Sequence, residues 1–118
     1  MTEAQQLLRR LAAGDERSLQ LVVSPTAEAA ATDRGGVAAA LDRRIRVLVR
    51  LAALLAIDAS IETVRWAVEL AMATGASDAA MAAVLLSTAP ETGGAQVAAS
   101  ASSLALALGF DVEATPDY

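Results

Sequence analysis

The sequence predicts an all-α protein, and three observations indicate this class. Apolar residues make up 55% of the 118 residues, whereas aromatic residues make up only 3%. Alanine is the most frequent residue, and it loses no side-chain entropy in a helix, whereas a β-sandwich needs many more β-branched and aromatic residues. Apolar residues recur at helical spacing, with Ser, Gly and Pro between the periodic stretches.

The first 36 residues predict two short helices and a third segment of undecided structure. Residues 3–13 form the first predicted helix, with leucines on one face and Gly14 at its end. Residues 16–23 form a second helix or an extended piece that Ser24-Pro25 terminates. Residues 26–33 are compatible with a helix, which the Gly35-Gly36 pair would break.

The next helix begins either near Val37 or at Asp42, whose side chain can cap a helix N-terminus, and it runs to residue 57. Its apolar residues at helical spacing predict a wide buried face formed by Ile45, Leu48, Val49, Ala52, Leu55 and Ala56.

Two capped helices follow. Ser60 is the predicted N-cap of a helix over residues 61–74, which a glycine terminates, and Ser77 is the predicted N-cap of a helix over residues 78–88. Ala89-Pro90 is expected to end the second of these, with residues 91–94 as a turn.

The last predicted helix, residues 95–108, is apolar nearly all round. A helix without a polar face is normally buried, and one small core cannot bury all the apolar residues of this chain. We therefore expect a homo-oligomer with this helix at a subunit interface.

The whole chain, 1–118, is expected to be a single domain, with N-terminal helices in 1–36, a helical core in 37–113 and a tail in 114–118.

Composition argues against several classes of function. The net charge is −5 and every basic residue is an arginine, which gives no basic surface for nucleic acid. The chain has no cysteine and no histidine, so disulfides, thiol chemistry and the usual metal ligands are absent, and we expect no metal and no cofactor. The polar N-terminus and the shortness of the apolar stretches predict a cytoplasmic protein with no membrane partner.

Several sequence elements in residues 41–113 together resemble the carboxymuconolactone decarboxylase-like family, which includes alkylhydroperoxidase D. Leu41-Asp42 followed by LVRLAAL is similar to the family's entry helix, and WAVELAMATG is similar to its His-x3-Ala-x3-Gly helix. AMAAVLLSTAP after the Ser77 cap is similar to the next helix, and the ending LALALGFDVE resembles a subgroup common in high-GC bacteria. The resemblance implies a six-helix bundle assembled as a homotrimer or homohexamer, with sites in clefts between helices.

The positions that carry chemistry in that family differ here. The two cysteines of the family's Cys-x-x-Cys correspond to Ser60 and Thr63, and its histidines correspond to Ala67 and Ser87. Dithiol peroxide reduction is therefore excluded, and without a histidine or a lysine no ordinary base remains to activate a hydroxyl group.

The remaining candidates for a site have two interpretations each. Glu62 is either a general acid or base, or a first-turn acid that stabilises the helix dipole and pairs with Arg65. Arg50 either holds a carboxylate or phosphate ligand, or lies on a solvated face. Trp66 either forms one wall of a ligand pocket, or packs in a core or interface. Ser60 is most simply a helix cap.

Three functions remain compatible with these residues. The first is a family member without thiols that binds, or binds and transforms, a small apolar or carboxylated molecule near Arg50, Ser60, Thr63, Trp66, Ala67 and Ser87. The second is a catalytically silent structural or regulatory oligomer. The third is a decarboxylase or lyase that uses Glu62 and arginine alone.

Overall fold

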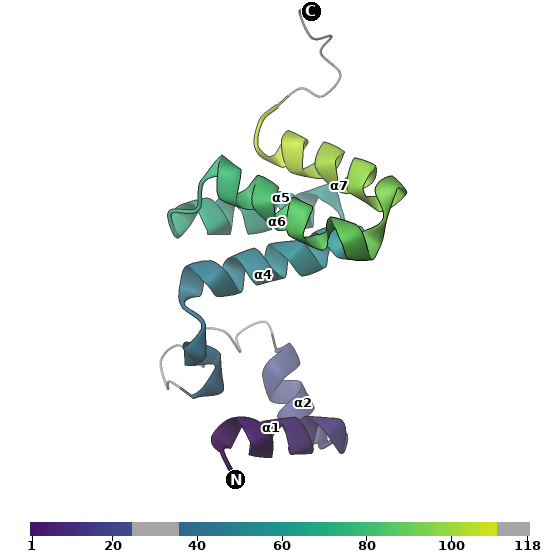
Figure 1. Cartoon of the computed structure of the whole chain (residues 1–118). Coiled ribbons are helices and arrows are strands. Elements are labelled where there is room, and N and C mark those ends of the chain that lie inside the picture. The colour runs from purple at the N-terminus through teal and green to yellow at the C-terminus, as the bar shows by residue number, and fades with distance from the viewer. Residues whose placement is uncertain (25–35, 111–118) are drawn as a thin grey trace, which may run out of the picture. The chain divides into compact units, whose positions relative to one another are not determined.

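The computed structural model describes residues 1–24 and 36–110, and all regular structure among them is helical (Figure 1). Six α-helices and one 3-10 helix are present in these ranges: α1 Glu3–Ala12, α2 Glu16–Val23, η1 Val37–Ala40, α4 Arg43–Ala56, α5 Ile61–Ala73, α6 Asp78–Thr92 and α7 Gly94–Ala107. The predicted all-α class and helical bundle are confirmed. Among the described residues, none of the helices combines the length and apolar composition needed to cross a membrane.

The chain divides into two compact units, Met1–Asp42 and a second unit that begins at Arg43. The expectation of one domain over residues 1–118, and that of a homo-oligomer, stay predictions.

The first unit contains α1, α2 and η1. Thr2 and Gln5 form a capping box at α1. The backbone N–H of Gln5 donates to Thr2 Oγ1 over 3.1 Å, and the backbone N–H of Thr2 donates to Gln5 Oε1 over 3.0 Å. The predicted bounds of α2 are confirmed, and α1 ends one residue before the predicted position. The segment 26–33 lies outside the described residues.

The second unit contains a four-helix bundle in two layers. Helix α4 packs against α5 and α6, and α7 packs against the same two helices. Figure 1 shows α4 and α7 on opposite sides with α5 and α6 between them, and we name α4 with α5 one layer and α6 with α7 the other. The buried apolar residues come from all four helices and one loop: Val47, Leu51, Leu55, Val64, Ala67, Val68, Ala71, Ala76, Met81 and Leu104.

The buried stripe of helix α4 agrees only in part with the predicted one. Leu55 is buried as predicted and Leu48 packs against the core, but the other buried residues are Val47 and Leu51, and the predicted Ile45, Val49 and Ala56 are exposed. Because α4 carries apolar residues on both sides, its periodicity is satisfied by either stripe, and packing against α5 and α6 selects Val47, Leu51 and Leu55.

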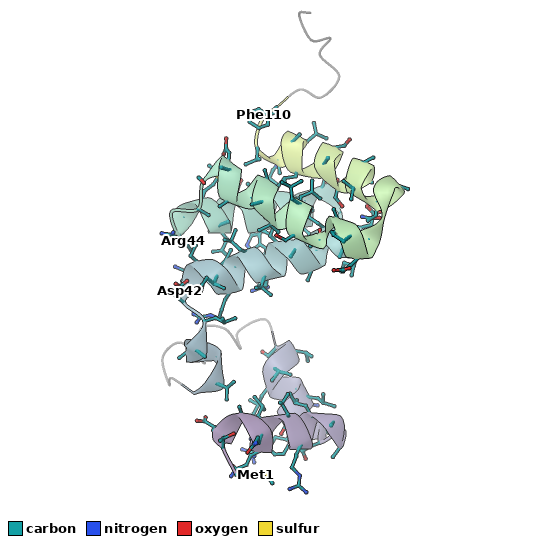
Figure 2. The ribbon with its side chains drawn as sticks, viewed as in Figure 1. Met1, Asp42, Arg44 and Phe110 are labelled. Atoms are coloured by element: carbon teal, nitrogen blue, oxygen red, sulfur yellow. The ribbon has the colours of Figure 1, made fainter. Side chains whose placement is uncertain are left out.

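Helix α5 begins and ends as its flanking residues predict. The Ser60 side chain accepts a hydrogen bond from the Thr63 amide, and Gly75 lies beyond the C-terminus with a φ of 89°, which glycine adopts without strain. A Cβ atom at Gly75 would lie 3.6 Å from an Arg44 guanidinium nitrogen. Arg44 lies near the start of α4 (Figure 2). Because its guanidinium group lies close to Gly75, its positive charge is at the C-terminal end of α5, which is the negative end of the helix dipole.

The C-terminal end of α4 is held by two side chains of α7. The Leu55 carbonyl oxygen accepts a hydrogen bond from Gln96 Nε2 over 2.8 Å and one from Ser100 Oγ over 3.0 Å. Gln96 Nε2 also donates to Ser100 Oγ over 3.0 Å. Ser100 is only 4% exposed, so the contact lies inside the protein. Without these bonds the Leu55 carbonyl, at the end of a helix, would keep only the longer bond of 3.3 Å from the Asp58 amide among the described residues.

The predicted end of α6 at Ala89-Pro90 is wrong, because α6 continues through Pro90 to Thr92. Proline removes one backbone N–H from the helix, and only two further residues of α6 follow it. Gly93 then serves as the C-cap of α6 and the N-cap of α7, with φ 83° and ψ 165°. That region of backbone conformation is essentially restricted to glycine.

Candidate functional site

The two positions that resemble the family's cysteines form one hydroxyl pair. Ser60 Oγ and Thr63 Oγ1 lie 2.9 Å apart, and the Thr63 amide donates to Ser60 Oγ over 3.3 Å. Both bonds belong to the N-terminal cap of α5. With no histidine, cysteine or lysine in the chain, this pair has no ordinary base to activate it, and its clear role is to begin the helix.

Two other candidates come together from neighbouring helices. The guanidinium carbon of Arg50, on α4, lies over the Trp66 ring, on α5, at 4.9 Å from the ring centroid. Such a cation–π contact typically contributes about 0.5–1 kcal/mol at an exposed site. Trp66 is 47% exposed, so nearly half of its side chain remains on the surface beside the cation.

Ala67 and Ser87 belong to neither pair. Ala67 is 2% exposed and lies in the core of the bundle. Ser87 is exposed on α6, and its hydroxyl donates to the Ala83 carbonyl of the same helix over 2.8 Å. This bond satisfies the serine hydroxyl donor within its own helix.

Glu62 lies in the first turn of α5 and is exposed. An acid at this position stabilises the helix dipole. Within the described residues, neither Arg65 nor any other cation forms an ion pair with Glu62. The acid–base role of Glu62 stays a prediction, as do the ligand-binding roles of the other candidates.

The sequence reasoning missed Gln96 and Ser100. The last helix was interpreted as apolar nearly all round, although these two polar residues lie four positions apart and thus on one face. That spacing was the available signal. Their hydrogen bonds to the Leu55 carbonyl give them a structural role.

In the ranges 1–24 and 36–110 no three acidic side chains gather into a group that could hold a metal ion.

No family model matches this chain, and neither a curated protein nor a solved structure shows significant similarity to it. The family resemblance therefore remains a hypothesis based on the residues quoted for it.

Proposed function

We propose that this chain binds a small carboxylated molecule with an apolar body at Arg50 and Trp66. The observation that supports this proposal is the contact between these two side chains, 4.9 Å from guanidinium carbon to ring centroid. The two residues come from different helices and are sixteen positions apart in the sequence. The packing of α4 against α5 brings them together, because residues so far apart in the sequence are not neighbours within one helix.

The two side chains offer complementary chemistry. A guanidinium group directs its N–H donors in its own plane and matches the two oxygens of a carboxylate. An indole ring offers a large, rigid apolar surface at low cost in conformational entropy. Because the cation–π contact already orders the arginine, less freedom is lost when a ligand binds.

Binding is favoured over turnover by the residues that the chain lacks. It has no thiol, imidazole or amine side chain to serve as a nucleophile or base at neutral pH. The resemblance to the carboxymuconolactone decarboxylase-like family supports a ligand in this region, since α5 corresponds to the family's site-bearing helix. We propose membership of that family on the same basis, with the catalytic groups replaced.

Trp66 is the only tryptophan of the chain, so its emission reports directly on the proposed site. We expect benzoate, phenylacetate or octanoate to change this emission saturably, and benzyl alcohol, which lacks the carboxylate, to bind more weakly. Arg50→Gln should weaken carboxylate binding about tenfold, since a hydrogen bond to a charged group contributes about 1.5 kcal/mol.

Arg65→Gln is the matched control, because it removes the same charge from an exposed position on α5. Equal losses of carboxylate affinity in the two variants would show that net charge alone causes the effect, and this result would contradict the proposed site. The absence of any saturable change with all three carboxylates would contradict the proposed ligand class. Native mass spectrometry of the purified protein, followed by identification of any released molecule, tests the same class without a chosen probe.

A further inference from the structure

The outward side of the α6–α7 layer carries no charged side chain. No charged residue occurs in residues 79–90 or 92–110. We define the α6–α7 face by the exposed residues that point away from the core of the bundle: Ala79, Ala82, Ala83, Leu86, Pro90, Ala95, Ala98, Ala99, Ser102 and Leu106. Two of them are large and project from a surface of small side chains, since Leu86 is 71% exposed and Leu106 is 50% exposed.

The other layer of the bundle has the opposite character. The helices α4 and α5 and the turn between them carry Arg43, Arg44, Arg46, Arg50, Asp58, Glu62, Arg65 and Glu69. A surface helix normally places charged residues on its solvent side. Both helices of the α6–α7 layer depart from this rule together, which indicates a surface that contacts a partner.

We propose that the α6–α7 face is the interface with a second copy of this chain. The chain has a net charge of −5, so two copies repel each other unless they meet where neither carries charge. A twofold interface brings the same face of both copies together, and an uncharged face meets its own equivalent without repulsion. Leu86 and Leu106 can insert between the alanine side chains of the opposite copy, and small residues allow the helices to approach closely.

The area of the face sets the strength of the association. Helices α6 and α7 have 15 and 14 residues, which at about 1.5 Å per residue makes each of them about 21–22 Å long. Two such helices about 10 Å apart present a surface of roughly 450 Å². Two copies then bury about 900 Å², which is below the roughly 1,200 Å² of a specific, stable interface and belongs to the weak, transient class. The dimer is therefore concentration-dependent.

The charges at the ends of α6 select between two pairings. If α6 packed antiparallel on its own equivalent, Asp78 would meet Glu91 of the partner subunit at both ends of the contact. If α6 packs on the partner's α7, neither acid meets a charge, because α7 has none. The second pairing avoids the repulsion.

Sedimentation velocity of the full chain, over protein concentrations from micromolar to near millimolar, tests this interface. We expect a monomer–dimer equilibrium that 1 M NaCl does not weaken, because salt screens only charged contacts. Leu86→Glu and Leu106→Glu should each raise the dissociation constant at least tenfold. Met72→Glu is the matched control, since Met72 is 53% exposed on α5, in the other layer.

Circular dichroism verifies that the three variants keep their helices, as substitution of exposed side chains should allow. A chain that stays monomeric throughout the concentration range would overturn the proposal. So would an equal loss of association in Met72→Glu, which would place the interface elsewhere, or dissociation by salt, which would show that charge holds the copies together.

Discussion

The hydrogen bonds between α7 and the end of α4 predict a measurable coupling between Gln96 and Ser100. Both side chains donate to the Leu55 carbonyl oxygen, over 2.8 Å and 3.0 Å. Among the described residues, the same oxygen accepts one further bond, a longer one of 3.3 Å from the Asp58 amide. We consider Ser100→Ala, Gln96→Leu and the double variant.

The expected losses of unfolding free energy follow from the hydrogen bonds that the Leu55 carbonyl keeps in each variant. Either single substitution keeps one side-chain donor on the Leu55 carbonyl, so each should lower the free energy of unfolding by about 1 kcal/mol. The double variant leaves a carbonyl at the end of the helix with the Asp58 bond alone. Because an underpaired buried acceptor costs about 1–3 kcal/mol, we expect the double loss to exceed the sum of the single losses by about 0.5–1.5 kcal/mol.

Urea unfolding followed by circular dichroism measures all four proteins of this cycle. The dependence of the unfolding free energy on urea should stay constant, since the buried surface hardly changes. Ser102→Ala, at an exposed position of α7, is the control for the helix propensity that alanine gains over serine. If the two single losses add within about 0.3 kcal/mol, the shared carbonyl contributes no coupling and the reasoning fails.

Three further predictions test the core, a cap and a carboxylate. Leu51→Ala should lower the unfolding free energy by about 2–5 kcal/mol, because Leu51 is fully buried in α4, whereas Val49→Ala should change it by less than about 0.5 kcal/mol. Ser60→Ala should cost about 1 kcal/mol by removing the N-cap of α5. Hydrogen bonds from the Ser18 hydroxyl and amide hold the pKa of Asp15 below its ordinary value. The helicity that Asp15 stabilises is therefore present at neutral pH and is lost as the pH falls below the ordinary aspartate value of about 3.9, which circular dichroism can follow.

Each of these predictions has its own control. Similar losses for the two α4 variants would mean that the core stripe is misassigned. An unchanged unfolding free energy in Ser60→Ala would show that α5 starts equally well without its cap. The variant Asp15→Asn keeps a capping side chain that does not titrate, so an acid transition that persists unchanged in it must come from other groups.

Most of the helices could be predicted because the signals that start and end them are interactions between residues close together in the sequence. The Ser60 and Ser77 caps and Gly75 mark helix ends through bonds and backbone angles within a few residues. The predicted end of α6 is wrong because a proline does not always stop a helix. Pro90 lacks the N–H that would bond to the Leu86 carbonyl, and α6 continues for two residues despite that lost bond.

Packing choices could not be predicted in the same way. The apolar residues of α4 satisfy two different stripes, and only the neighbouring helices decide that Val47 is buried and Val49 exposed. The same limit applies to the candidate site. Arg50 and Trp66 were each identified from the sequence, but their contact depends on how α4 lies against α5.

The single residue between α6 and α7 has a consequence for the motions of the second unit. Gly93 ends one helix and begins the next, so the connection has no spare length to take up a displacement of either helix. If α7 moves away from α4, the last turn of α6 must move with it or unwind. In hydrogen exchange, amides on both sides of Gly93 should therefore open as one cooperative segment, with the bonds to the Leu55 carbonyl as the contacts that must break first.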